Sequence, residues 1–262
     1  MLRSSNPALS EGHFGHLARD LAREQPQEQY DVMTVAGTVN KTAMALVACI
    51  IAAGFVWFQY FSGSSSAMIW TIGGCIVGLI LGLATAFVPK LAPYTTLPYA
   101  AAQGFFLGGI SAVVESQVVA QGGPGGIAIQ AFACTMGVFA VMLTLFLTRI
   151  IRVTEKLKAG ITAAIGGVLI FYLIAIVGSW LGWNGAVQFL DFNNGGLLSI
   201  GISVVIVAIA SFSLLLDFDM IEKGVQMQAP KKMEWYGAFG LMVTLVWLYL
   251  EILRLLAKLR SR

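Results

Sequence analysis

Seven long runs of apolar residues, separated by short polar breaks, make up most of this chain. A membrane-spanning helix needs about 20 predominantly apolar residues, and each run has that length. The runs cover residues 43–61, 67–88, 97–118, 127–148, 161–182, 197–220 and 237–258. The breaks at 62–66 and 121–126 are rich in Gly, Ser and Pro, which favour turns. The pattern predicts an all-α integral membrane protein with one seven-helix transmembrane domain (43–262) after a polar N-terminal tail (1–42).

Composition supports this fold class and excludes others. Hydrophobic residues make up 58% of the 262 positions and charged residues 11%, against about 45–50% and 25% in soluble domains. A net charge of +3, spread along the chain, gives no basic patch for nucleic acid. The three cysteines lie inside apolar runs, where we expect apolar filling rather than a disulfide. They are Cys49, Cys75 and Cys134.

Basic residues gather in alternate loops. They precede the first run and occupy the 2–3, 4–5 and 6–7 loops, whereas the other three loops have none. The positive-inside rule therefore predicts a cytoplasmic N-terminus. The last run breaks the pattern, because Arg254, Lys258, Arg260 and Arg262 would lie outside if it spans. The run either spans or is re-entrant with both termini cytoplasmic, and its length favours spanning.

Small residues recur every four positions in two runs, as Gly74-Gly78-Gly82-Ala86 and Ala100-Gly104-Gly108. Such spacing lets helix backbones approach closely in a bilayer. We interpret both series as packing faces within the bundle, with a homodimer interface as the alternative.

Four acidic residues fall within or near the apolar runs: Glu115, Asp217, Asp219 and Glu251. A carboxylate at the bilayer centre costs on the order of 2.5 kcal/mol, so such residues face a bundle interior or a cavity and are functional candidates. Glu115 shares a face with Gly104, Gly108 and Ser111; it either lines an outer mouth or reaches the membrane interface.

A small, polar stripe runs along the sixth run. At 100° per residue, one line contains Ser199, Ser203, Ala210, Ser213 and Asp217. Asp219 lies on the opposite side, four residues before Lys223, and is expected to be solvated or paired with a lysine.

The last run also has a polar face, made of Gly240, Thr244, Trp247, Glu251, Leu255 and Lys258. Arg254 follows Glu251 by three residues, which allows an intrahelical ion pair. The alternative hypothesis is that Asp217 and Glu251 face each other and share a proton or a bound cation, forming an ion- and proton-sensing pair. Hard oxygen ligands suit calcium, although two carboxylates are an incomplete site. Other residues predicted to line a pathway are Glu115, Ser203, Ser213, Thr244 and Arg254.

Enzymatic activity has little support, because the chain contains no GxSxG, HExxH, Walker or Rossmann fingerprint. We therefore expect a protein without catalytic residues and without a cofactor other than calcium as a bound or transported ion. His13 and His16 lie in a tail segment with helical apolar spacing, and two histidines alone are a weak metal site.

Three segments carry a family resemblance. The segments are Ser5-Asn6-Pro7-Ala8-Leu9 with Met33-Thr34-Val35-Ala36-Gly37-Thr38-Val39-Asn40-Lys41-Thr42-Ala43, then Leu91-Ala92-Pro93-Tyr94 with Gln103-Gly104-Phe105-Phe106-Leu107-Gly108-Gly109-Ile110-Ser111, and Leu248-Tyr249-Leu250-Glu251-Ile252-Leu253-Arg254-Leu255-Leu256. Together they resemble the Bax inhibitor (transmembrane BAX inhibitor motif) family, in its bacterial YccA-like branch. Gln103 stands where that family often has an acid, and Glu251 where the wider family often has Asp.

The resemblance implies a seven-helix bundle with a central last helix, in the inner (plasma) membrane. It also implies a pH-sensitive calcium leak gated by an acidic pair, which maps to Asp217 and Glu251. Two other functions remain open: a non-transporting regulator that binds a membrane protease or a stress or cell-death protein, and a proton-coupled transporter. The expected partners are the lipid bilayer and calcium or protons, with no nucleic acid. The sequence leaves the oligomeric state open.

Overall fold

Seven long α-helices form one bundle in the computed structural model, which describes residues 32–182, 185, 187–192 and 194–261. They are α2 (Val35–Phe61), α3 (Ser66–Phe87), α4 (Ala92–Ala120), α5 (Ile127–Leu147), α6 (Glu155–Trp180), α7 (Leu197–Gln226) and α8 (Met233–Arg260). Short 3-10 turns, η1 (Pro89–Leu91) and η2 (Val187–Phe189), lie in two connections. All seven helices are long and apolar enough to cross a membrane, so the predicted fold class is confirmed. The first part of the tail, with His13, His16 and residues 5–9, lies outside the described residues.

Five of the helices, α2, α4, α6, α7 and α8, extend by about a turn or more beyond the apolar runs that predicted them. Capping side chains or a proline explain three of the earlier starts. Helix α2 begins at Val35 because the Thr34 side chain accepts a hydrogen bond from the Gly37 N–H. Helix α6 begins at Glu155, where Thr154 caps the Leu157 N–H in the same way. Helix α4 begins at Ala92 instead of residue 97, since proline is tolerated in a first helical turn that needs no N–H donor.

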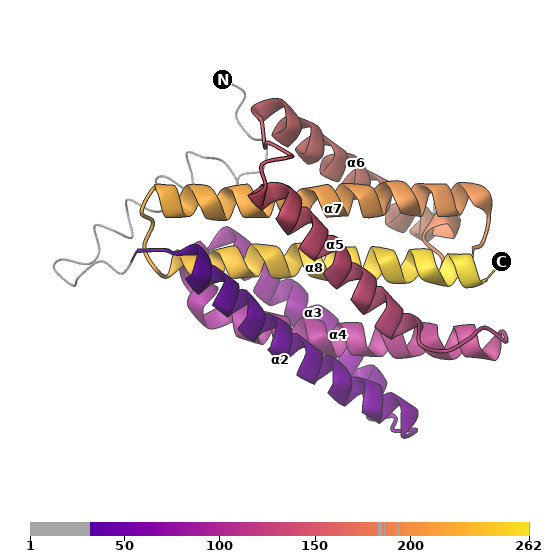
Figure 1. Ribbon diagram of the computed structural model, residues 1–262. Helices are drawn as coiled ribbons and strands as arrows, with labels where there is room; N and C mark the ends of the chain where they lie inside the picture. The colour runs from indigo at the N-terminus through magenta and orange to yellow at the C-terminus, as the bar shows by residue number, and fades with distance from the viewer. Residues whose placement is uncertain (1–31, 183–184, 186, 193, 262) are drawn as a thin grey trace.

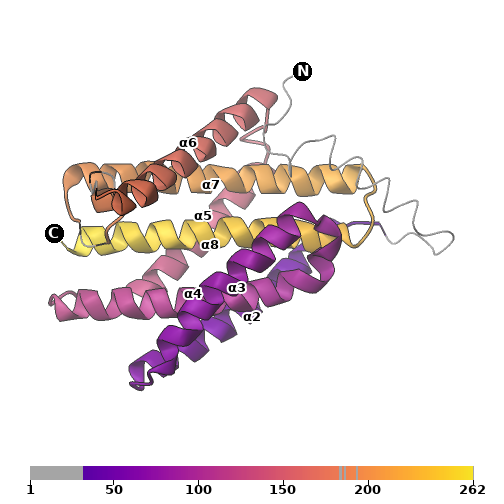
Figure 2. The ribbon, with the colours of Figure 1, turned by 180° about the vertical axis from the view of Figure 1, so that it is seen from behind.

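Helix α8 is the central element of the bundle. It contacts α2, α4, α5 and α7, and more of it is buried than of any other helix that could span. Figures 1 and 2 show α7 running alongside α8, with α2, α3 and α4 on its other side and α6 outermost against α7. It is one unbroken helix of 28 residues, about 42 Å long at 1.5 Å per residue. This length fits the spanning interpretation of the last run rather than the re-entrant one.

The predicted glycine series in α3 packs against α4. A Cβ atom on Gly74 would lie 2.6 Å from the Ala102 carbonyl oxygen and 2.9 Å from the Phe106 nitrogen. Farther along α3, Gly78 faces the Gln103 side chain and Gly82 faces the Tyr99 ring. These contacts confirm that the series is a packing face within the bundle. The three cysteines are free, with Cys49 buried and Cys75 and Cys134 exposed on the bundle surface.

The loops sort into two groups at opposite ends of the bundle. At one end, the Met33 N–H donates to the Ala229 carbonyl over 2.7 Å, and Lys158 of α6 pairs with Asp219 of α7 at 2.9 Å. At the other end, Arg260 of α8 donates to the Pro124 carbonyl and to Gln130. The loops with basic residues therefore share one end, as the alternation of charge predicted. Which end is cytoplasmic remains a prediction.

Candidate functional site

The polar stripes of α7 and α8 face each other along one line of contact, which we call the α7–α8 seam. It comprises Ser199, Ser203, Ala210, Ser213 and Asp217 of α7 and Gly240, Thr244, Glu251, Arg254 and Lys258 of α8. At one end of the seam, Asp217 hydrogen-bonds Thr244. Lys258, fourteen residues after Thr244, donates to Oγ of Ser203, fourteen residues before Asp217, over 2.9 Å. The helices are antiparallel, so the same register places Ala210 opposite Glu251. Both faces were predicted from helical spacing, and the structure brings them together.

Asp217 has one carboxyl oxygen with no partner. Oδ2 is buried and forms no hydrogen bond among the described residues, while Thr244 supplies the contact to the carboxyl group. Gly240 lies beside it, because a Cβ at that position would be in van der Waals contact with Asp217 Oδ1, at 3.7 Å. Ionised, this group would hold a buried negative charge with a single hydroxyl donor, an arrangement that favours protonation or the approach of a cation.

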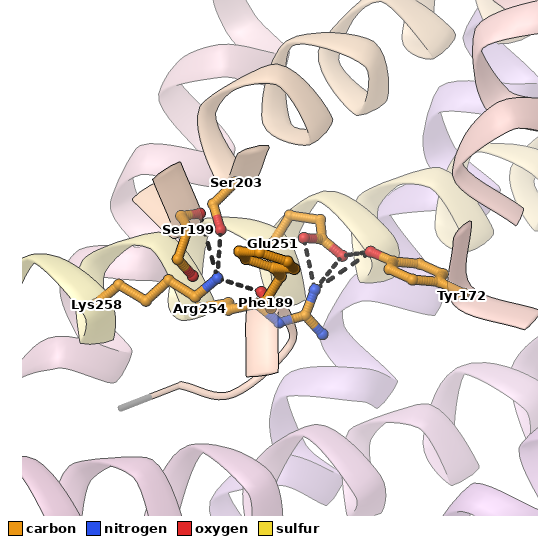
Figure 3. A network of polar contacts seen from close by, with 7 residues as sticks. All are labelled: Tyr172, Phe189, Ser199, Ser203, Glu251, Arg254 and Lys258. Carbon is orange, nitrogen blue, oxygen red and sulfur yellow. Dashed lines mark hydrogen bonds and ion pairs between the residues drawn. The ribbon is translucent and has the colours of Figure 1, made fainter. Parts of the chain in front are cut away.

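Glu251 is held by an ion pair and a phenol (Figure 3). Its two carboxylate oxygens accept hydrogen bonds from Arg254 Nη1 at 2.9 and 2.8 Å, and Tyr172 of α6 donates to Oε1. Arg254 lies over the rings of Tyr172 and Phe192, with its guanidinium carbon 5.8 and 5.3 Å from the centroids. Glu251 itself is 1% exposed. The intrahelical ion pair that the spacing allowed is present.

The hypothesis of a directly shared proton therefore does not describe this conformation. Asp217 binds Thr244, and its other oxygen is unpartnered rather than shared with Glu251. Thr244 and Glu251 lie seven residues apart, about 10 Å along α8. The helical spacing predicted the correct faces, but the interhelical register, which the sequence does not reveal, sets Glu251 opposite Ala210. Calcium has no two-carboxylate site here, and no group of three or more His, Cys, Asp or Glu residues gathers anywhere in the described ranges.

Lys258 is a functional candidate that sequence reasoning assigned only to a face. It is fully buried, and its ammonium donates to the Phe189 carbonyl at 2.6 Å, to Ser203 Oγ at 2.9 Å and to the Ser199 carbonyl at 3.4 Å (Figure 3). Three neutral oxygens thus use the three donors of the ammonium. The signal in the sequence was its position on the polar face of the last run.

The remaining predicted residues have structural contacts. Glu115 is 8% exposed and caps the start of α5, where it accepts hydrogen bonds from the Gly126 N–H and, at 3.2 Å, from the Ala128 N–H. Glu115 therefore binds the connection between α4 and α5, rather than lining an outer mouth or reaching the membrane interface. Ser213 donates to the Ala210 carbonyl within α7 over 2.7 Å. Asp219 pairs with Lys158 at 2.9 Å and with Lys223 at 3.5 Å, which confirms the predicted lysine pairing.

The residues of the first resembling segment join α2 to the start of α8. Glu234, 1% exposed, accepts hydrogen bonds from the Thr34 N–H at 2.9 Å and the Thr34 hydroxyl at 3.0 Å, and it pairs with Lys41. Gly37 lies against the Glu234 carboxylate, where a Cβ atom would have no space. Thr34, Gly37 and Lys41 of this segment therefore enclose one buried carboxylate.

The second and third segments meet in the same way. Gly104 and Gly108 of α4 lie directly against the α2 backbone at Cys49 and Ala53. Ser111 of α4 and Tyr249 of α8 are hydrogen-bonded through their hydroxyls at 2.6 Å. The second segment thus packs against α2 through its glycines and reaches the third segment, in α8, through one hydrogen bond.

Comparison with known proteins agrees with these motifs. The family model described as "Bax inhibitor 1 like" matches residues 6–261, nearly the whole chain. No curated protein and no solved structure gave a match.

Proposed function

The chain belongs to the Bax inhibitor 1 like family, and on that premise we propose that it is a pH-sensitive cation leak channel of the plasma (inner) membrane. Calcium is the proposed transported ion, the N-terminus is cytoplasmic, and the protein acts without catalysis. Asp217 is the proposed titrating group.

The observation that carries the proposal is the unpartnered Oδ2 atom of Asp217 in the seam. A protonated carboxyl group can remain there with Thr244 as its contact, since burying a neutral polar group costs far less than burying a charge. The ionised group needs a cation or water, and Gly240 places no side chain against its carboxyl group. Deprotonation therefore favours an opened seam that admits cations, so flux should rise as pH rises.

Glu251 has a different part in this proposal from the one that spacing suggested. Arg254 pairs with its carboxylate and Tyr172 fixes its position, so Glu251 has its partners in place, whereas Asp217 has an oxygen without one. One carboxyl group, rather than a coupled pair, then sets the pH response.

The test is calcium flux into proteoliposomes at acidic and alkaline pH. The wild-type flux should rise with pH, and Asp217→Asn should remove most of that dependence by fixing the group in a neutral state. Asp219→Asn is the matched control: it lies two residues away but is paired with lysines, and its pH profile should follow the wild type.

Two results would overturn the proposal. Equal loss of pH dependence in the Asp217 and Asp219 variants would indicate a general surface-charge effect. Liposomes without any downhill cation flux would refute the leak itself, and saturable uptake of a solute would indicate a proton-coupled transporter instead.

A further inference from the structure

Charge is unevenly distributed along the α7–α8 seam. Near Asp217 the only charged group of the seam is a carboxyl, whereas the end of the seam near the C-terminus of α8 holds Arg254 and Lys258 against one buried carboxylate, Glu251. Asp191 acts favourably on Lys258 from the adjoining loop, but it is exposed and water screens it. With Lys258 protonated, the cluster of Glu251, Arg254 and Lys258 therefore has a net charge of +1.

This cluster and Asp217 lie on one line but at different depths. Lys258 follows Thr244 by fourteen residues, about 21 Å along α8 and roughly two thirds of a 30 Å hydrocarbon core. Figure 3 shows the cluster enclosed by Tyr172 of α6 and by Phe189 of the α6–α7 connection. A cation that passes along the seam from Asp217 must pass this buried positive charge.

We propose that Lys258, supported by Arg254, is an electrostatic barrier that sets how the seam discriminates among cations. A buried ammonium is costly, and a hydrophobic residue of similar length would fill the same space without that cost. Three oxygens from η2 and α7 hold the charge at one point of the seam. Lys258 is thus a specificity-determining residue, and this inference rests on the proposed cation leak.

An electrostatic barrier differs from a steric obstruction because its height depends on the charge of the ion. The energy of an ion in the field of a fixed charge is proportional to the charge of the ion, so Ca²⁺ meets twice the barrier of K⁺. Rates depend exponentially on barriers, and the fold-change for Ca²⁺ is therefore about the square of that for K⁺. A roughly tenfold rise in K⁺ flux on removing the charge would therefore accompany a rise of about a hundredfold in Ca²⁺ flux.

The experiment compares K⁺ and Ca²⁺ flux in proteoliposomes at a pH where the wild type conducts. Lys258→Met removes the charge and keeps the length of the side chain, and we expect the unequal rises above. Ser203→Ala is the matched control, because it removes one hydrogen bond from Lys258 and leaves the charge; any change should be by the same factor for both ions. Glu251→Gln raises the net charge to about +2 and should lower Ca²⁺ flux more than K⁺ flux.

Glu251→Gln is expected to lower the flux, whereas Lys258→Met is expected to raise it. Glu251→Gln therefore tests the barrier even if Lys258→Met fails to fold, which thermal melting in detergent would reveal. Equal fold-changes for both ions in Lys258→Met, or an effect of Ser203→Ala as large as that of Lys258→Met, would refute the barrier while the leak stands. A wild type that conducts neither ion would refute the leak, and the barrier with it.

Discussion

Adding one methyl group at Gly74 should destabilise the bundle, whereas the same change at Gly73 should not. The new Cβ at position 74 would lie 2.6 Å from the Ala102 carbonyl oxygen, 2.8 Å from Phe105 Cβ and 2.9 Å from the Phe106 nitrogen. Two of these atoms belong to the α4 backbone and cannot rotate away, so α3 must move outward. Position 73 has no heavy atom within 4 Å of such a Cβ, which makes it the matched control.

The expected magnitude follows from two terms. Both variants gain about 1 kcal/mol from replacing a mid-helix glycine by alanine. Only Gly74→Ala bears the overpacking cost of about 1–3 kcal/mol. The two variants should therefore differ by about 1–3 kcal/mol, or by about 2–10 °C in melting temperature for a chain of this size.

The assay is thermal melting of the purified protein in detergent, followed by intrinsic tryptophan fluorescence. Gly78→Ala should fall between the two variants, because its Cβ would meet only the end of the flexible Gln103 side chain, at 2.9 Å. Equal melting temperatures for the Gly73 and Gly74 variants would mean that α3 is not packed on α4 through this face.

Three further predictions concern the ends of the helices. Lys41→Met leaves the buried Glu234 carboxylate without its cation and should lower the free energy of unfolding by about 2–4 kcal/mol; adding Glu234→Gln should recover part of that loss in a double-mutant cycle, and additive losses would contradict the pairing. Glu115→Ala removes the acceptor of two N–H groups at the start of α5 and should cost about 1–2 kcal/mol, visible as faster hydrogen exchange in that first turn alone. In a variant without the native cysteines, an impermeant thiol reagent applied to intact cells should label Gly185→Cys but not Arg152→Cys, and the reverse pattern would invert the predicted orientation.

The sequence predicted the faces of the helices better than their ends. Helical spacing identified the seam residues Ser203, Asp217 and Lys258, because the side-chain direction depends only on the 3.6-residue period. Helix ends were missed where charged residues continue a helix beyond its apolar run. In α7 the added turns contain Glu222, which binds Arg149 from the α5–α6 connection. A hydropathy pattern does not reveal such a partner.

The fold class and the polar faces followed from the sequence alone, since a bilayer requires apolar runs of fixed length and places every buried charge at a protein contact. The partner of each charge was decided by the tertiary structure. The register of α7 against α8 sets Thr244 beside Asp217 and Ala210 opposite Glu251. The ion pair with Arg254 was available within one helix, but Tyr172, Phe189 and Ser199 come from other segments. Contacts between distant segments depend on how the helices pack, and no local period in the chain encodes that packing.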